Sequence, residues 1–563
     1  MRLSLERWSR VCFCLVLAVM LIVGIYTYQD YGITLDEGVE RKTAFLNYQY
    51  AYKRLTGETV GKFFNIELEE YKDRYYGVAL QLPMVFAEHM TGFTMPLRDA
   101  FLMRHLYTFV LCMAGWVCFY LFCKQVFNNS WIALLGMLMV ALYPRFWGEQ
   151  FTNIKDMVFA ASCCASMMGV AMCLKHEGKW KYEILGADLN AVCANTRFIG
   201  FQFPALLFGY RILRDWFIDG SAHGRGKAWI KGELPRYFCH LLLVLAVYFL
   251  ISPASWENPL EYLSGVFRTF TNYSTWNGNV LFLGRFYPGD QLPWYYLLIW
   301  ILLSAPLWYL LLAVIGIWDA GKAFAEKHGL KKWLAGEHRY FVFCLVIAAI
   351  PLTTPVFKEV TLYNSWRHAY YVFPALVVLA LFGLRRLWCC MRSKRIMRQI
   401  MTVTICVMLS LQAGWTVYNH PYEKVYFNAV GRQNAELLDR DYWYETVYEQ
   451  LQVILRNDET NLISLSSDGV ISISVNNFLT EEEAKRFFVM DDELKMADYY
   501  IDGANTVRPE SFEEYTPVYE LRMKDGLVLS TIHIRNDVLE KRFNGVYPEY
   551  NTASDVGHGK QSE

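Results

Sequence analysis

Two adjacent carboxylates, Asp36 and Glu37, follow closely on an apolar run over residues 11–28. A carboxylate at a membrane surface can act as a general base that takes the proton from an attacking hydroxyl group. Acids near the start of a helix also complement its dipole and cap its first turn, which is the commoner role of such a pair. The pair therefore predicts catalysis only if complementary cations are brought to the same place.

A second cluster of ionisable residues stands between two apolar runs, in the sequence YPRFWGEQFTNIKDMVFAA at 143–161. It contains Arg145, Glu149, Lys155 and Asp156, and the last two are followed at once by the apolar residues MVFAAS. An ionisable group at such a membrane edge costs free energy unless it pairs with an opposite charge or takes part in function. A local Lys155–Asp156 pair, or a lysine that snorkels to the surface, is the structural alternative to a functional role.

A third cluster, Arg367 and His368, begins another apolar run within FKEVTLYNSWRHAYYVFPAL at 357–376. A guanidinium group suits a phosphate at this depth because it donates paired hydrogen bonds, although interfacial anchoring among Tyr and Trp is equally common. The loop 254–293 is rich in Trp, Tyr, Asn and Gly. Those side chains fit contact with a sugar or a lipid headgroup, or simply a packed interfacial loop.

The elements that must position these clusters are membrane spans. Of the 563 residues, 54% are hydrophobic and 19% are charged, which is typical of a multi-span protein because each crossing needs about 20 apolar residues. Apolar runs predict spans near residues 10–28, 100–122, 131–147, 154–174, 236–253, 294–316, 340–355, 367–384 and 399–418. The less regular stretch 184–213 is interpreted as two short helices, which gives about 11 crossings in an all-α bundle.

Charge predicts the orientation of the spans. With the N-terminus inside, the loops 175–183, 211–236, 317–339 and 385–398 are cytoplasmic, and they are the most basic short loops of the chain. Residues 432–563 carry 26 acidic and 13 basic side chains and are expected outside. We therefore expect a multi-pass protein of the cytoplasmic (plasma) membrane, with the N-terminus inside and the C-terminal domain outside.

Two domains are predicted: a transmembrane domain over 1–431 and a small soluble α/β domain over 432–563. In the second, Thr480 with Glu483 forms a capping box, and the run 517–535 predicts a hairpin that turns at Asp525-Gly526.

The long outer loop 29–99 contains two helical stretches, near 38–56 and 66–90, that are rich in Tyr and Phe and are expected to lie along the interface. With this orientation all of the charged clusters face outward. The chemistry that needs acids and cations together at a membrane surface is transfer of a group from a lipid phosphate. The acid would activate the acceptor, and the cations would stabilise the departing phosphate.

Taken in order, the motifs resemble the GT-C superfamily of membrane glycosyltransferases. They are most similar to bacterial relatives of the dolichyl-phosphate-mannose protein mannosyltransferases and of the lipid A aminoarabinose transferase. PRFWGEQFTNIKD (144–156) resembles the family pattern PRFxGHSxxNPKD, with Glu149 in place of His and Ile154 in place of Pro. SWRHAYYVFPAL resembles a late-span RHxxFxxPxL pattern, and HPYEKVYFN (420–428) followed by DYWYE (441–445) resembles a segment of one bacterial branch.

The resemblance implies a GT-C fold and a hexosyltransferase that uses a polyprenyl-phosphate-linked sugar and inverts the anomeric centre. It implies that Asp36 is the general base, assisted by Glu37, and that Lys155 and Arg367 hold the donor phosphate. The further candidates are Arg145 and His368 at the phosphate, and Asp156, Glu149 and Asn153 as groups that orient these residues or the acceptor. The acceptor is expected to be a protein hydroxyl, a cell-wall polymer or a glycolipid of the cell envelope.

No cofactor is expected, since Lys and Arg can neutralise a monophosphate leaving group. A divalent metal bound by Asp36, Glu37, Glu149 and Asp156 is the less favoured alternative. Membrane lipid is an expected partner and nucleic acid is not. Two other functions fit the sequence: a transporter or flippase for a lipid-linked saccharide, which should place charges at the midplane and show repeated halves, and a non-catalytic surface assembly protein.

Overall fold

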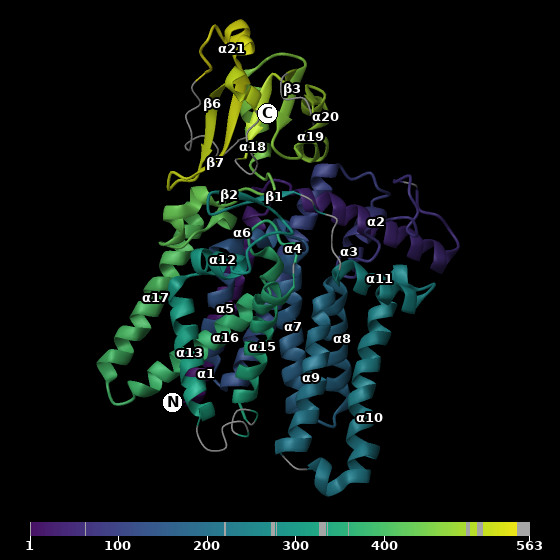
Figure 1. The fold of residues 1–563 in the computed structure, drawn as a ribbon, viewed down its shortest axis with the longest axis vertical. Helices are drawn as coiled ribbons and strands as arrows, with labels where there is room; N and C mark the ends of the chain where they lie inside the picture. The colour runs from purple at the N-terminus through teal and green to yellow at the C-terminus, as the bar shows by residue number, and fades with distance from the viewer. Residues whose placement is uncertain are drawn as a thin grey trace.

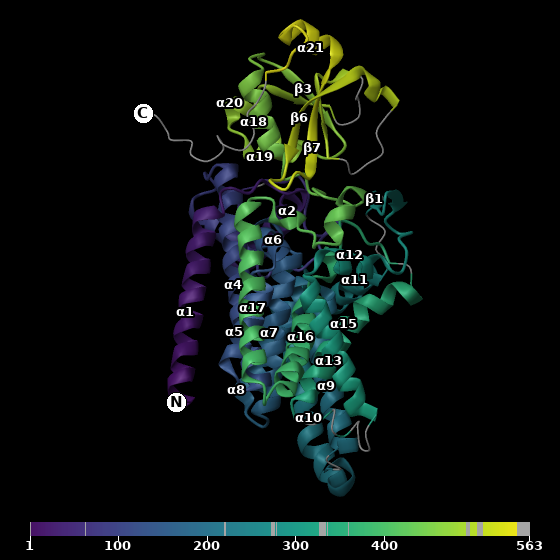
Figure 2. The same cartoon turned by 90° about the vertical axis from the view of Figure 1, so that its left-hand side faces the viewer.

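The computed structural model describes residues 2–61, 63–218, 221–271, 276, 278–325, 331, 334, 336–358, 360–490, 496–503 and 510–548. Long helices run side by side and form a bundle, and a smaller region that contains a β-sheet lies on one end of it (Figure 1). The N-terminus lies at the other end of the bundle (Figure 2). The chain is therefore mostly helical with a small C-terminal sheet region, as the sequence predicts.

Eight helices in the described part of the chain are long and apolar enough to cross a membrane. They are α1 (Arg2–Thr27), α4 (Leu97–Phe127), α7 (Asp156–Lys175), α10 (Ser221–Leu250), α13 (Leu307–Ala325), α15 (His338–Phe357), α16 (Val372–Cys390) and α17 (Arg395–Tyr418). A ninth span results if α5 (Ser130–Ala141) and α6 (Pro144–Thr152), which are bent by 65°, count as one. The chain is thus a multi-pass membrane protein, but the expected number of about 11 crossings is not confirmed.

Prolines explain where two predicted spans differ from the structure. The predicted span 131–147 is broken before Pro144, which starts α6 and has no N–H with which to continue α5. The predicted span 294–316 divides into α12 (Tyr296–Ser304) and α13, and Pro306 stands at the break. Pro306 therefore places the start of the long helix α13 at Leu307.

The irregular stretch 184–213 is confirmed as two helices, α8 (Trp180–Thr196) and α9 (Gln202–Leu213), joined by the short helix η1 (Phe198–Phe201). A π-helical turn, η2 (Arg214–Ile218), follows α9. The connections from α7 to α8 and from α16 to α17 lie at the end of the bundle away from the C-terminal region (Figure 1). These two connections belong to the four basic loops that are predicted to be cytoplasmic. Both therefore lie at the same end of the molecule.

Small residues let the central helices approach one another closely. A Cβ atom on Gly383 of α16 would lie 1.9 Å from the carbonyl oxygen of Leu312 in α13, and one on Gly115 of α4 would lie 2.6 Å from Cα of Ala161 in α7. Such contacts drive helix association in lipid, where apolar side chains gain little from leaving the solvent. Of the candidate spans α7 is the most enclosed, so its first residue, Asp156, is held firmly.

A layer of short elements covers the end of the bundle beneath the C-terminal region (Figure 1, Figure 2). It consists of α2 (Leu35–Thr56), α3 (Leu82–Met90), η3 (Pro253–Ser255), α11 (Pro259–Thr271), β1 (Asn279–Phe282), β2 (Arg285–Pro288), η4 (Arg367–Ala369), η5 (Glu423–Val425) and η6 (Gly431–Leu437). The first helix predicted in loop 29–99 is confirmed as α2. The second, predicted over 66–90, forms only from Leu82 onward, and the residues before it fold mainly as turns.

The C-terminal region contains a five-stranded sheet in the order β4-β3-β5-β7-β6. Its elements are α18 (Val447–Asn457), β3 (Ile463–Ser467), α19 (Ser472–Phe478), α20 (Glu481–Ala484), β4 (Phe487–Val489), β5 (Tyr499–Asp502), η8 (Glu510–Glu514), β6 (Tyr515–Arg522), β7 (Val528–Arg535) and α21 (Asn536–Phe543). The predicted hairpin is confirmed as β6–β7, with Gly526 in its turn at φ +88°. The capping box of Thr480 and Glu483 is also confirmed.

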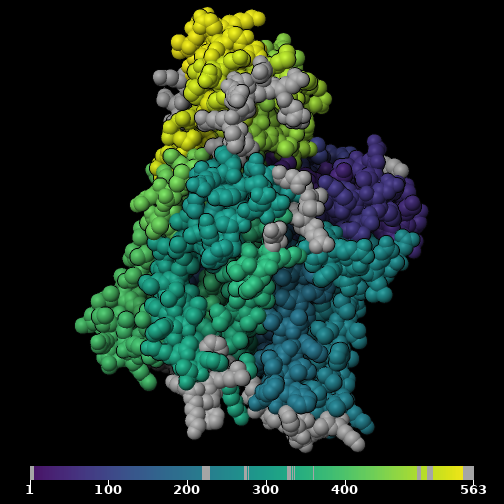
Figure 3. Space-filling view, in the orientation of Figure 1, coloured from purple at the N-terminus to yellow at the C-terminus, as the bar shows by residue number. Residues whose placement is uncertain are grey.

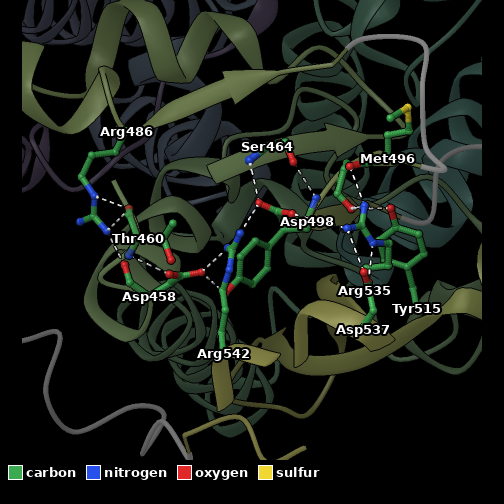
Figure 4. A network of polar contacts seen from close by, with 12 residues as sticks. Asp458, Thr460, Ser464, Arg486, Met496, Asp498, Tyr515, Arg535, Asp537 and Arg542 are labelled. Atoms are coloured by element: carbon green, nitrogen blue, oxygen red, sulfur yellow. Dashed lines mark hydrogen bonds and ion pairs between the residues drawn. The ribbon is translucent and has the colours of Figure 1, made fainter. Parts of the chain in front are cut away.

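Two arginines link the end of the chain to this sheet (Figure 4). Arg542 of α21 donates to Asp458 at 2.8 Å and to Asp498 at 2.7 Å, and Asp498 also accepts from the backbone N–H of Ser464 at 3.2 Å. Arg535 at the end of β7 lies 3.9 Å from the same Asp498. These ion pairs hold the sheet region together, while the domain boundary predicted at 431/432 stays a prediction.

Candidate active site

A cavity of about 1290 Å³ lies where the upper layer meets the bundle and the C-terminal region. Its walls come from α2, η1, the end of α15 and the segments 360–371, 439–444 and 468–470. The space-filling view shows the C-terminal region seated on the upper layer, with the first outer loop beside it (Figure 3). Segments more than 300 positions apart in the chain, around Asp36 and Arg367, therefore meet around one cavity.

The adjacent acids Asp36 and Glu37 divide into two roles. Asp36 lines the cavity, is about one-third exposed (32%), and accepts a hydrogen bond from Nη1 of Arg367 at 2.7 Å. Glu37 is buried, accepts from the backbone N–H of Thr34 at 2.8 Å, and lies 2.9 Å from Nε2 of His105. Glu37 thus completes a capping box that fixes the start of α2, and only Asp36 is available to a ligand.

Arg367, in η4, is the cation nearest to Asp36. Its Nη1 also lies 3.1 Å from Oδ2 of Asp156, and its Nη2 lies 3.4 Å from the side-chain oxygen of Asn364. Asp156 is held in turn by an ion pair with Arg197. The guanidinium group of Arg367 is therefore anchored on its inner side and reaches the cavity edge beside Asp36.

Asn153 positions Asp156 rather than lining the cavity. Its side-chain oxygen accepts from the backbone N–H of Asp156, the first residue of α7, at 2.7 Å. The side-chain nitrogen of Asn153 donates to Glu149 at 2.7 Å. Asn153 thus joins the start of α7 to Glu149 on α6.

Lys155 also lines the cavity and forms an ion pair with Glu40. The sequence interpretation omitted Glu40, although it stands one helical turn after Asp36 and thus on the same face of α2. It omitted Arg197 from the site as well, although that residue was the irregular charge in the stretch 184–213. Gln81 donates to Glu40 at 2.7 Å, so the partner of Lys155 is itself fixed.

The charges around the cavity balance. Three acids and three cations, which we call the cavity cluster, form two sets of ion pairs. Asp36, Asp156, Arg197 and Arg367 are linked to one another, and Lys155 pairs separately with Glu40. Each of the three cations is paired with at least one carboxylate, so the formal charge of the cluster is zero. An anionic ligand that binds one of these three cations must therefore compete with a carboxylate, and Asp36 is the most exposed of the three acids.

Arg145 and Glu149 are not brought to the cavity, in contrast to the sequence expectation. Arg145 is buried and donates to the backbone oxygen of Tyr426 at 3.1 Å. Glu149 is also buried and accepts from Tyr370 at 2.7 Å and from Tyr442 at 2.5 Å. Both residues lie on α6, whose residues are all buried, and they fasten this broken helix to its surroundings instead of facing a ligand.

His368 lines the cavity but does not supply a positive charge there. Burial lowers its pKa well below the usual value, and the nearby cations Arg367, Arg197 and Lys155 lower the pKa further. A neutral imidazole can donate only one hydrogen bond to a phosphate oxygen. At the phosphate, His368 could therefore donate a neutral hydrogen bond but not a charged one.

The segment 439–445 forms a wall that the sequence interpretation did not assign to the site. Asp439, Tyr442 and Trp443 line the cavity, and burial raises the pKa of Asp439 to about 7. Lys424 lies 2.7 Å from Asp441 and 2.9 Å from Glu445, so the segment is fastened at both ends. The motif DYWYE was visible in the sequence, but nothing in its spacing indicated that it folds back onto Arg367.

The four carboxylates named as alternative metal ligands do not form one ligand set. Asp36 and Asp156 share Arg367, whereas Glu37 is bound by Thr34. Glu149 is occupied by two tyrosine hydroxyl groups. Cation ligands need several oxygens around one point, so these residues do not fit a common metal ion.

No protein-family model matches the chain, and no curated protein sequence does. Among solved structures, ArnT from Cupriavidus metallidurans is similar in the apo state (TM-score 0.48, 12% identity, 97% of this chain and 100% of that chain). The same protein bound to undecaprenyl phosphate is also similar (TM-score 0.46, 11% identity, 93% and 97%). The Archaeoglobus fulgidus oligosaccharyltransferase, in a complex with Zn and sulfate, has a TM-score of 0.45 at 10% identity (94% and 76%).

These similar proteins are glycosyltransferases of the GT-C superfamily, the superfamily that the sequence motifs resemble. All three TM-scores are below 0.5 and the identities are 12% or less. The matches therefore carry no functional argument for this chain, and its function has to be argued from the cavity.

Proposed function

We propose that this multi-pass membrane protein is an inverting glycosyltransferase. It would move a hexose from a polyprenyl-phosphate donor to an acceptor hydroxyl at the outer face of the cytoplasmic membrane. One observation carries the proposal: a partly exposed acid, Asp36, shares a cavity at one end of the bundle with Lys155, Arg197 and Arg367. An acid that can accept a proton and cations that can hold a phosphate are what this transfer needs.

The acid acts on the acceptor. A carboxylate oxygen of Asp36 takes the proton of the acceptor hydroxyl while the hydroxyl oxygen attacks the anomeric carbon of the sugar. The bond between that carbon and the phosphate oxygen breaks on the opposite side, and its electron pair stays with the phosphate. A single displacement of this kind needs one base and inverts the anomeric centre.

The cations act on the leaving group. The departing lipid phosphate gains negative charge in the transition state, and preorganised guanidinium and ammonium groups stabilise that charge. Asp156 holds Arg367 and Arg197 in place, and Glu40 holds Lys155. These two acids therefore position the phosphate-binding cations rather than reacting themselves.

The ion pair between Asp36 and Arg367 links donor binding to base activation. A carboxylate oxygen of Asp36 is bound by Arg367 at 2.7 Å, so this oxygen is occupied by the guanidinium group. A donor phosphate that binds Arg367 competes with Asp36 for the same guanidinium edge. Donor binding thus releases the carboxylate, which then becomes free to bind the acceptor hydroxyl.

The proposal is tested by mass spectrometry of surface glycans in three strains: one that lacks the chain, one with the wild-type chain and one with Asp36→Asn. We expect one sugar modification to disappear in the first and third strains and to be present in the second. The variant must reach the membrane in wild-type amount, which immunoblotting measures. A full glycan profile with Asp36→Asn would refute the enzymatic function and favour transport or a non-catalytic role.

A further inference from the structure

The guanidinium group of Arg367 packs against two aromatic rings. Its central carbon is 4.8 Å from the ring centroid of Tyr363 and 4.8 Å from that of Trp443. Tyr363 precedes Arg367 by four residues, but Trp443 comes from beyond α17, the last candidate span. Packing against two rings restricts the plane of the guanidinium group, and its Nη1 lies at the edge that contacts Asp36 and Asp156.

Trp443 is held rigidly by the residues on either side of it. Tyr442 donates to the buried Glu149 on α6 at 2.5 Å. On the other side, Glu445 pairs with Lys424 at 2.9 Å and accepts a hydrogen bond from Thr152. Because both flanks are bound to α6 and η5, the indole ring has no freedom to leave Arg367 without breaking buried contacts.

The indole N–H of Trp443 has no hydrogen-bond partner among the described residues, although the side chain is 2% exposed and lines the cavity. The indole N–H groups of Trp300 and Trp366 are also unpaired, but of these three residues only Trp443 lines the cavity, where a ligand can accept its hydrogen bond. Indole can only donate. The ligand atom must therefore be an acceptor, such as a phosphate oxygen, and it must lie beside the guanidinium group that the same ring covers.

We propose that Trp443 is part of the phosphate site: its ring positions Arg367, and its N–H donates to an oxygen of the lipid-borne phosphate. The C-terminal segment 439–445 would then complete the site instead of merely covering it. This inference rests on the proposed function, because it assigns the phosphate to the donor. The same chemistry would also fit a free phosphate, and the experiment separates the two sources.

The experiment measures the affinity of the purified full chain in detergent for a polyprenyl monophosphate, with wild type, Trp443→Phe and Trp443→Leu. Phenylalanine keeps the stacked ring and removes the N–H, so we expect about tenfold weaker binding with little change in thermal stability. Leucine also removes the stacking and should weaken binding further. Inorganic phosphate is added as a competitor, and we expect no competition at concentrations comparable to the lipid.

Trp300→Phe is the matched control. Trp300 is equally buried and its ring lies 5.6 Å from the central carbon of a guanidinium group, that of Arg145, but it does not line the cavity. We expect Trp300→Phe to bind the lipid as wild type does. If Trp443→Phe also binds as wild type does, or if both variants lose affinity equally, the role of Trp443 is refuted while the proposed function stands.

The remaining outcomes of the experiment also test the proposal. A wild-type protein that does not bind the polyprenyl monophosphate would refute the donor assignment and this inference together. Equal competition by inorganic phosphate would overturn the lipid-borne form of the site. Selective loss of lipid binding in Trp443→Phe, with stability and the Trp300 control unchanged, would establish the indole N–H as a phosphate contact.

Discussion

Two clusters of buried ion pairs can be compared in this protein. The cavity cluster, described above, lies at the end of the bundle and borders a space of about 1290 Å³. A second group, which we call the closed cluster, consists of Glu183 on α8, Arg211 on α9 and His240 on α10. Here Arg211 Nη2 lies 2.6 Å and His240 Nδ1 lies 3.0 Å from the Glu183 carboxylate, and none of the three residues lines the cavity.

The difference is one of partners and access, not of residue type. Glu183 and Arg211 are each 1% exposed and pair with one another. Asp36 is one-third exposed, and its cation partner among the described residues, Arg367, is shared with Asp156. Ionisable residues within a membrane protein are candidates for function, but the closed cluster does not border the cavity, and its ion pairs join α8, α9 and α10. An acid becomes available for chemistry when its partner is shared and a cavity reaches it.

The largest effect is expected for Asp36→Asn. Amide replaces the proton acceptor, so the transfer rate should fall by about 10²–10⁴-fold, the usual contribution of a general base. The change also removes the carboxylate that competes for Arg367, so the affinity for a polyprenyl monophosphate should rise by up to about tenfold. Transfer from a labelled lipid donor and equilibrium binding measure the two effects. Weaker lipid binding in this variant would contradict the competition between Asp36 and phosphate.

The closed cluster should respond in the opposite way to Glu183→Gln. The substitution leaves the buried Arg211 with only the more distant Glu177, at 3.8 Å, as a counter-charge, and this costs about 3 kcal/mol of stability. The protein that remains folded should transfer sugar at the wild-type rate, because the cluster does not border the cavity. Thermal unfolding in detergent and the rate per folded molecule separate the two effects. A lower rate with unchanged stability would show that the closed cluster takes part in function.

A smaller effect is expected from Arg367→Lys, with Arg145→Lys as its matched control. Lysine keeps the charge but loses the fork and the planar group that stacks on Trp443, so lipid-phosphate affinity should fall by about tenfold. The same change at Arg145, which lies outside the cavity, should leave affinity unchanged and lower the thermal midpoint. Equal affinity loss in both variants would mean that the cation effect is not local to the cavity.

The smallest effect concerns pH and the buried group that fastens segment 439–445. Burial raises the pKa of Glu445 to about 7, above its value near 4.5 in an unfolded chain. The folded state therefore binds the proton more tightly, and stability falls as pH rises from about 4.5 to 7. Glu445→Gln should remove this pH dependence, which has a slope of about 1.4 kcal/mol per pH unit in that window. Thermal midpoints between pH 5 and 8 measure it; an unchanged slope would refute the assignment.

Local features of the chain were predictable from the sequence. The apolar runs, the paired helices of 184–213, the hairpin at Gly526 and the cap at Thr480 depend on periodicity and turn chemistry within a few residues. Span ends were predicted less well where Pro144 and Pro306 interrupt apolar runs. The positions of Asp36, Lys155 and Arg367 at one end of the bundle also followed, because each stands at the end of an apolar run.

The sequence by itself determined that this chain crosses a membrane several times and carries acids and cations where apolar runs end. Only the tertiary structure decided which of them meet. In the structure Glu37 caps a helix, and Arg145 and Glu149 are buried on α6 away from the cavity. Glu40, Arg197 and Trp443 line the cavity. The physical reason is that a side chain's partners come from helices hundreds of residues apart, and the packing of those helices is not encoded in any short stretch of sequence.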